Sequence, residues 1–253
     1  MQTISQFKFF DAHFHIIDKR FPLVANQGYL PEYFTAADYG ERMRSYNLIG
    51  GAVVSGSFQG FDQTYLHTTL KELGPGFVGV TQLPVSVSNE ELVELDKAGV
   101  RAVRFNLKRG GCESVENLEG VAKRVYETVG WHTELYVDSK ELSELYKVLI
   151  RLPAVSVDHL GLSRVGFADL LRLVEKGIHV KATGFSRTDF DVKMALKEIV
   201  SVNPSALMFG TDLPSTRAPK SYSYDDFIIV IDAIGEEAAT KVFYDNAVSF
   251  YRL

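Results

Sequence analysis

The feature that most constrains this chain is an alternation of two kinds of segment, repeated eight times. Short apolar runs rich in β-branched and aromatic residues predict strands, and the amphipathic runs between them predict helices. The predicted strands are Phe7–His15, Ile49–Gly56, Phe77–Pro84, Arg101–Leu107, His132–Ser139, Ala154–Gly161, Ile178–Gly184 and Ala206–Pro214. Eight strand–helix units in 253 residues are typical of a (β/α)8 (TIM) barrel, which needs about 250 residues. We therefore expect an α/β fold of this kind, with one domain over residues 1–253.

An open doubly wound sheet is the competing architecture for alternating strands and helices. It requires a glycine-rich phosphate-binding loop after the first strand. This chain has Asp11-Ala12-His13-Phe14-His15 at that place, so the barrel is favoured.

The predicted helices carry end signals. Thr35 and Ser88 are suited to cap helix starts, and Ser88 with Glu91 has the spacing of a capping box. The later helices are predicted at Ser139–Leu152, Phe167–Gly177, Asp189–Val202, Tyr224–Ile234 and Glu236–Tyr251. Glycines stand where helices should end, at Gly74, Gly99, Gly130, Gly177 and Gly235.

Composition restricts the classes of molecule that this chain is expected to bind. Lys and Arg total 27 and Asp and Glu total 32, so the formal charge is −5. A mildly acidic chain without a basic block argues against nucleic acid and anionic membranes. The single cysteine, Cys112, excludes an intrachain disulfide and fits a reducing compartment. No apolar run approaches the roughly 18 residues of a membrane span. We expect a cytoplasmic protein that acts on a small molecule, and we leave a homo-oligomer open.

Polar residues follow almost every predicted strand. In a barrel enzyme the reacting groups stand at the carboxyl ends of the strands. The residues at those ends are His13, His15, Ser55, Ser57, Gln82, Arg104, Asn106, Tyr136, Asp138, Asp158, His159, Thr183, Ser186, Arg187, Thr211 and Asp212. A barrel with a purely structural role would not need this set.

His13 and His15 are the strongest local signal, because alternate residues of a strand point the same way. Two such imidazoles can converge on one ion or one carbonyl oxygen, although an isolated pair is more often structural. Here His159 and Asp212 stand at other strand ends, which favours a site. Asp212 could deprotonate a water molecule. His67, His132 and His179 are expected to be structural or solvent-facing.

Arginines near the strand ends are candidate anion clamps, since a guanidinium binds a carboxylate through two parallel hydrogen bonds. Arg104 is the best placed of them, and Arg109 and Arg187 lie in loops. Tyr136 and Ser57 are candidate hydrogen-bond donors to a ligand. Lys181 lies within the seventh predicted strand, where it could equally face the helices.

These motifs together resemble the amidohydrolase superfamily, and within it the amidohydrolase-related branch that includes dicarboxylate and sugar lactonases. The segments that carry the resemblance are Asp11-Ala12-His13-Phe14-His15, Val103-Arg104-Phe105-Asn106, Gly130-Trp131-His132, Val157-Asp158-His159-Leu160-Gly161, Phe209-Gly210-Thr211-Asp212-Leu213-Pro214 and Asp245-Asn246-Ala247. The resemblance implies a hydrolase in which His13, His15 and His159 polarise a carbonyl and Asp212 activates water. It also implies that Ser57, Arg104, Arg109, Tyr136 and Arg187 bind the substrate.

The chain departs from the superfamily's two-metal pattern. It has no lysine inside the fourth predicted strand, and it has Tyr136 where that pattern has a histidine. A two-metal site is therefore disfavoured. The reaction needs no metal, or it uses one divalent ion, zinc above all, on His13, His15, His159 and Asp212. Leu213-Pro214-Ser215 replaces the Trp-Pro-His of the dicarboxylate lactonase, so the substrate can differ.

Three functions follow from these residues. The first is hydrolysis of a lactone or related ester of a small carboxylate-bearing metabolite. The second is a single-zinc decarboxylase of the same superfamily. The third is a barrel that binds a metabolite without catalysis, because fold does not dictate function.

Overall fold

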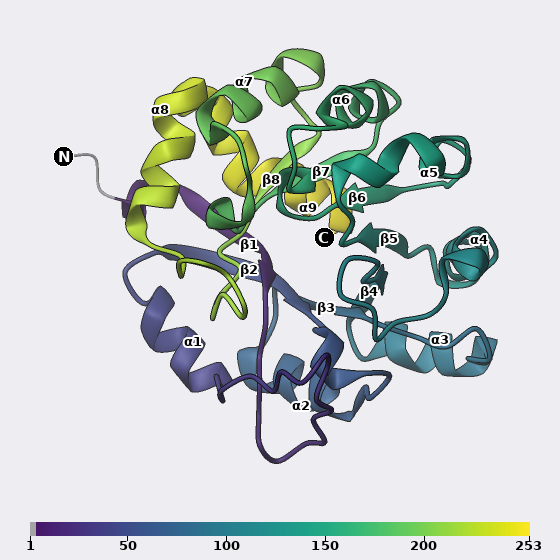
Figure 1. Ribbon diagram of the computed structural model, residues 1–253. Coiled ribbons are helices and arrows are strands. Elements are labelled where there is room, and N and C mark those ends of the chain that lie inside the picture. Colours follow the sequence, from purple (N-terminus) through teal and green to yellow (C-terminus); the bar gives the residue numbers. More distant parts are fainter. Residues whose placement is uncertain (1–3) are drawn as a thin grey trace.

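The computed structural model describes residues 4–253. Eight parallel strands form one sheet in chain order, from β1 to β8, and helices surround the ring of strands (Figure 1). The strands are β1 (Lys8–Phe14), β2 (Asn47–Val54), β3 (Phe77–Thr81), β4 (Val100–Phe105), β5 (His132–Leu135), β6 (Val155–Val157), β7 (His179–Ala182) and β8 (Leu207–Phe209). The predicted (β/α)8 barrel is confirmed, and the open sheet is not observed in this part of the chain.

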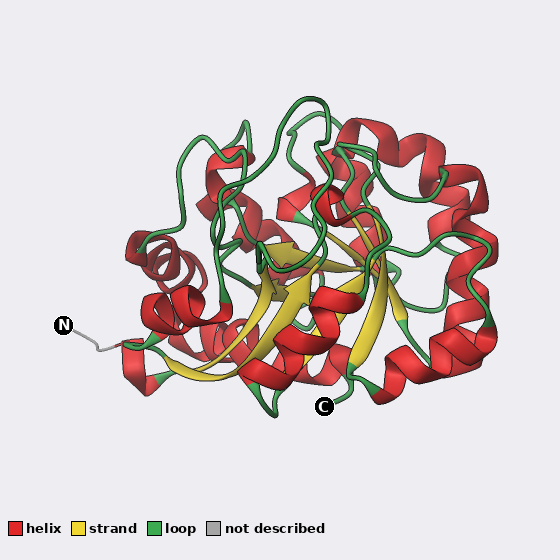
Figure 2. Cartoon of the chain, turned by 90° about the horizontal axis from the view of Figure 1, so that it is seen from below, coloured by secondary structure: helices red, strands yellow, loops and turns green. Residues whose placement is uncertain are grey.

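The helices pack outside the strands, and the long loops gather on the side opposite the C-terminus (Figure 2). The helices are α1 (Ala36–Met43), α2 (Thr64–Leu73), α3 (Asn89–Lys97), α4 (Leu118–Val129), α5 (Leu142–Leu149), α6 (Phe167–Glu175), α7 (Val192–Val202), α8 (Tyr224–Thr240) and α9 (Asn246–Tyr251). Amphipathic helices bury one face against the sheet, and this apolar layer forms the larger core.

Helix ends follow the sequence signals. Thr35 accepts a hydrogen bond from the Asp38 amide and caps α1, and Ser88 accepts one from the Glu91 amide and caps α3. Gly235 has φ +78°, a left-handed conformation, and interrupts α8 where two helices were predicted to meet. One π turn, Lys241–Asp245, then leads into α9.

The C-terminal helix covers the amino-terminal end of the barrel. The ring of Phe250 packs against His132 and His179, which begin β5 and β7, at ring-centroid distances of 4.2 and 4.1 Å. Both histidines therefore serve packing, as predicted, and His67 is exposed on α2. No helix among residues 4–253 is long and apolar enough to cross a membrane. The cytoplasmic location and the one-domain assignment stay predictions.

The two ends of the sheet meet through backbone hydrogen bonds. The Asp212 amide donates to the His13 carbonyl at 2.7 Å, and the His15 amide donates to the Leu213 carbonyl at 2.7 Å. Gly210 makes this approach possible, because a Cβ at that position would lie 2.6 Å from the backbone nitrogen of His13. The chain after β8 is thereby joined to the end of β1.

A buried carboxylate reinforces the same junction. Asp11 accepts hydrogen bonds from the Thr211 amide at 2.8 Å and from the Thr211 hydroxyl at 2.7 Å. The Tyr39 hydroxyl donates to it as well, at 3.1 Å. Burial raises the pKa of Asp11 to about 6, and these donors limit the rise.

Charged side chains fill the middle of the barrel. Lys181 Nζ lies 2.5 Å from Glu134 Oε2 and 3.9 Å from Asp158 Oδ1, and all three side chains are fully buried. The Tyr251 hydroxyl donates to Glu134 at 2.5 Å, and His132 Nε2 lies 3.1 Å from the same carboxylate. Lys181 therefore faces the interior rather than the helices. Burial raises the pKa of Glu134, but the Lys181 ammonium and His132 overcome this effect and lower it to about 2.

We expect the substitution Lys181→Met to destabilise the fold strongly, because Glu134 would stay buried without its cation. Loss of one partner of a buried pair costs about 3–5 kcal/mol, and urea unfolding at pH 7 measures the change in the free energy of unfolding. In the wild type the lowered pKa of Glu134 contributes stability above its unfolded pKa, and this stability is lost at lower pH. In K181M burial would raise the pKa of Glu134, so the deficit should shrink as the pH falls from that raised pKa toward the wild-type value of about 2.

The control for this prediction is Lys193→Met. Lys193 pairs with Asp232 at 3.0 Å on the surface, with both side chains about half exposed. Such pairs contribute at most about 1 kcal/mol. A K181M protein as stable as K193M at pH 7 would contradict the role given to the interior pair.

Candidate active site

A cavity opens at the carboxyl ends of the strands. Eight of the predicted site residues line it: His15, Ser57, Arg104, Arg109, Tyr136, His159, Arg187 and Asp212. The remaining lining residues are Tyr29, Gly56, Phe58, Asn106, Thr216 and Arg217. His13 lies fully buried beside His15, with 5.0 Å between the ring centroids. The structure thus brings the predicted residues together.

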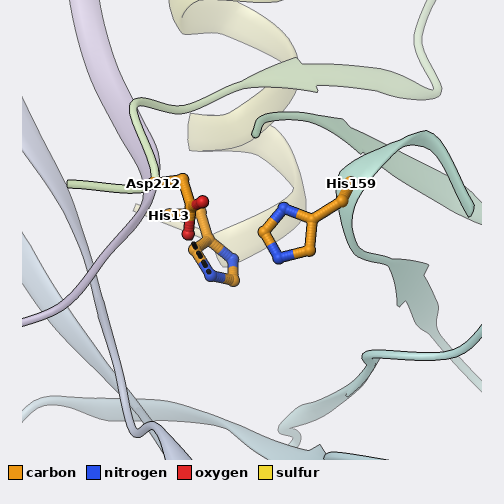
Figure 3. Close-up of side chains that lie close together, drawn as sticks. All are labelled: His13, His159 and Asp212. Carbon is orange, nitrogen blue, oxygen red and sulfur yellow. Dashed lines mark ion pairs between the residues drawn. The ribbon is translucent and has the colours of Figure 1, made fainter. Parts of the chain in front are cut away.

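His13, His159 and Asp212 lie together although they come from β1 and from the turns after β6 and β8 (Figure 3). The His13 and His159 ring centroids are 4.9 Å apart. His159 Nδ1 lies 2.7 Å from the Thr183 hydroxyl, and its ring packs edge-on against Tyr136. His159 and Asp212 both have positive φ, +53° and +58°. Residues other than glycine adopt this conformation rarely, and such residues cluster at active sites.

The two carboxylate oxygens of Asp212 have different surroundings. Oδ2 accepts a hydrogen bond from Arg187 Nε at 2.8 Å, and Arg187 Nη2 lies 2.7 Å from it in an ion pair. Oδ1 lies 3.8 Å from His13 Nε2 and 3.6 Å from His15 Nε2, and it has no hydrogen bond from residues 4–253. Burial raises the pKa of Asp212, but the Arg187 charge and the neighbouring imidazoles together outweigh it, and the pKa falls well below the ordinary value. Asp212 is therefore ionised at neutral pH.

The imidazoles turn acceptor nitrogens toward this carboxylate. His15 Nδ1 lies 2.7 Å from the Val54 carbonyl, which can only accept, so Nδ1 carries a proton, and in the neutral ring Nε2 has the lone pair. His13 Nδ1 lies 3.4 Å from Asp158 Oδ1, so the carboxylate favours a proton on Nδ1, although no hydrogen bond joins the two atoms. Burial lowers the pKa of His13 to about 4, so its ring is neutral at pH 7. Lone pairs of two rings thus face a carboxylate oxygen.

Such a set of acceptors fits a positive charge. Ligand atoms of His13, His159 and Asp212 all lie within 4.8 Å of one another, and two imidazoles with a carboxylate suit zinc. His15 was predicted as a further ligand, but it lies outside this group. His13, Glu134 and Asp158 form a second such group, where Lys181 already supplies a cation.

Two of the predicted anion clamps are paired within the chain. Arg104 Nη2 lies 2.8 Å from Asp158 Oδ2, and its Nη1 donates to the Ser55 carbonyl. Arg187 pairs with Asp212, as described above, and donates to the Thr216 carbonyl. Both guanidinium groups still line the cavity. Their roles in substrate binding, like those of Ser57, Arg109 and Tyr136, stay predictions.

Sequence reasoning missed several residues of this region. Glu134 and Lys181 stand inside strands, and Tyr29 and Arg217 stand in loops after β1 and β8. The alternation of polar residues along β5 and β7 could have indicated the first two. No sequence pattern indicates the loop residues.

Known proteins resemble this chain over nearly its whole length. A 2-pyrone-4,6-dicarboxylate hydrolase of Comamonas testosteroni is 27% identical over 274 residues, which cover 95% of this chain and 89% of the relative. Among solved structures, a probable 2-pyrone-4,6-dicarboxylic acid hydrolase of Acinetobacter baumannii with citric acid bound has a TM-score of 0.84 at 19% identity, covering 97% of this chain and 99% of that one. A structure from Pseudomonas putida that is named for the same activity has a TM-score of 0.81 at 25% identity, covering 96% and 97%.

The family model named Amidohydrolase matches residues 10–253. The match begins within β1, just before the His13 and His15 pair, and it includes the last helix. This chain therefore belongs to the amidohydrolase family and is a hydrolase of that family.

Proposed function

We propose that the protein hydrolyses the ester bond of a lactone ring that carries carboxylate groups. The observation that carries this proposal is that Asp212 Oδ1 lies, buried, close to the imidazole nitrogens of His13 and His15. Four guanidinium groups line the cavity at this place. The name of the Comamonas relative, which specifies a pyrone dicarboxylate, supports the same substrate class.

Asp212 is the general base. A water molecule held against Oδ1 gives its proton to the carboxylate while its oxygen bonds to the lactone carbonyl carbon. The tetrahedral intermediate then collapses, the ring C–O bond breaks, and the proton passes to the departing oxygen. The product is an open-chain acid. His13, His15 and His159 surround the place where the carbonyl oxygen becomes negative, and a proton or a cation held by their facing nitrogens would stabilise that charge.

Arg187 couples substrate binding to the strength of the base. Its charge lowers the pKa of Asp212 in the free protein, which weakens the carboxylate as a base. A substrate carboxylate that accepts hydrogen bonds from Arg187 shares that charge, so the pKa of Asp212 rises when the substrate is present. Arg104, Arg109, Ser57 and Tyr136 line the same cavity and orient the ring.

One divalent ion fits His13, His159 and Asp212, with His15 beside them. When bound, zinc would polarise the carbonyl and lower the pKa of a water molecule. Asp158 lies beside Nδ1 of His13, and the Val54 carbonyl lies beside Nδ1 of His15. Partners of this kind hold ligand histidines in one tautomer. Without an ion, a proton on one imidazole would supply the positive charge.

We expect Asp212→Asn to lower kcat for 2-pyrone-4,6-dicarboxylate by about 10³-fold, the effect of removing a general base. The loss of pyrone absorbance measures turnover. Asp232→Asn, at a half-exposed carboxylate, serves as the control and should keep wild-type activity. A D212N protein that turns over at the wild-type rate would rule out Asp212 as the base.

The same assay separates the other functions. Release of carbon dioxide without ring opening would indicate the zinc decarboxylase. Tight binding of a carboxylate metabolite without any turnover would indicate a binding barrel. A wild-type protein that opens no carboxylate-bearing lactone would contradict the proposal.

We expect Zn²⁺ to bind the chelator-treated protein at one site, because a cation relieves the repulsion among the facing lone pairs. Isothermal titration calorimetry measures the stoichiometry. His159→Gln should weaken binding by about tenfold or more, as loss of an imidazole ligand does for a metal held by so few groups. His67→Gln, at an exposed ring on α2, should leave it unchanged. Equal Zn²⁺ binding by both variants would assign the positive charge to a proton.

A further inference from the structure

The four guanidinium groups of the cavity form two classes. Arg104 and Arg187 are each paired with a buried carboxylate. Arg109 and Arg217 also line the cavity, yet no carboxylate within residues 4–253 forms an ion pair with either of them. Both are half-buried. The cavity therefore carries positive charge that the chain itself leaves unneutralised.

Arg217 is held in place from one side. Its Nη1 donates to Asn26 Oδ1 at 3.2 Å, its Nη2 donates to the Asn26 carbonyl, and its guanidinium lies 4.4 Å from the centroid of the Tyr29 ring. These contacts use two of the five N–H groups of an arginine. The remaining donors are available to a ligand. The backbone of Arg217 has φ +57°, a conformation that costs free energy for a residue other than glycine.

Asn26 also holds the loop that carries Arg109. Its Nδ2 donates to the Arg109 carbonyl at 3.3 Å, and Gln27 Nε2 donates to the same carbonyl at 3.1 Å. The Arg109 amide donates to Asn106 Oδ1 at 3.0 Å. Asn26 thus sets the relative position of the two arginines from a third segment.

The two arginines repel each other electrostatically. Burial lowers the pKa of Arg217, and the positive charge of Arg109 lowers it further. An anion between the two groups would remove this repulsion and supply the missing hydrogen-bond acceptors. The chain as a whole has a charge of −5, so a local positive site is also what draws an anionic substrate to the cavity.

The pair stands toward the outside of the site. Arg109, Arg217, Tyr136 and Arg187 line both the inner cavity and an outer depression that contains Lys108. His159 and Asp212 line only the inner cavity. Arg109 and Arg217 therefore lie where the inner cavity meets the outer depression.

We propose that Arg109 and Arg217 form an outer carboxylate site, in which Arg217 is the specificity-determining residue that selects dianionic over monoanionic substrates. The identity of the ester that is cleaved rests on the proposed function, but the carboxylate site can be tested by binding alone.

The test compares isophthalate with benzoate, two planar rings that carry two carboxylates and one. Calorimetry on the wild-type protein should show isophthalate binding about tenfold or more tightly than benzoate, the effect of a further charge-assisted interaction. Arg217→Gln and Arg109→Gln should each bring the ratio of the two affinities close to one. The ratio is informative even if benzoate binds at the outer site in the wild type. In each variant both ligands depend on the remaining arginines of the inner cavity.

Two variants keep the result independent of loop damage. R217Q removes the contacts with Asn26, whereas the Arg109 side chain makes no hydrogen bond or ion pair among the described residues, so R109Q isolates the charge. Arg44→Gln, at an exposed arginine paired with Glu41 on α1, should keep the wild-type ratio. An unchanged ratio in R109Q and R217Q, or a wild-type ratio near one, would overturn the outer carboxylate site.

Failure of the proposed function has a different signature. If no lactone is hydrolysed but the ratio falls in both variants, the outer site stands without the lactonase. If D212N abolishes hydrolysis while the ratio is unchanged in R109Q and R217Q, the lactonase stands without the outer site.

Discussion

The site depends on the hydrogen bonds that join the end of β1 to the chain after β8. The Asp212 amide binds the His13 carbonyl, and the His15 amide binds the Leu213 carbonyl. These backbone contacts place the carboxylate of Asp212 beside the imidazoles of His13 and His15, which come from the other end of the chain. They require Gly210, since any side chain there would collide with His13. The hydrogen bonds that close the barrel therefore also bring the reacting groups together.

Much of this arrangement could be predicted from sequence, because parallel strands in a barrel deliver their carboxyl ends to one rim. Eight apolar runs were enough to place Asp212 near His13, His15 and His159. The strand ends were less well predicted. The run Ala206–Pro214 continues past β8, which ends at Phe209, because apolar residues also pack in the turn that follows the last ladder hydrogen bond.

The pairing of the interior charges and the position of Arg217 could not be predicted, for different reasons. Glu134 and Lys181 pair across 47 residues, and a polar residue in a strand does not reveal which face of the sheet it occupies. Arg217 and Tyr29 meet through the paths of two irregular loops. No periodicity encodes such paths, so their contact appears only in three dimensions.

Arg217 and the reacting groups are supported by separate contacts. Asp212 is anchored by the junction of β1 with the end of β8, whereas Arg217 is held by Asn26 and Tyr29 at the periphery. Replacements of the side chains at Asn26, Tyr29 and Arg217 can accordingly alter which metabolites bind while Asp212 keeps its place beside His13 and His15. Descendants of one ancestral barrel could in this way acquire new substrate ranges through a few replacements.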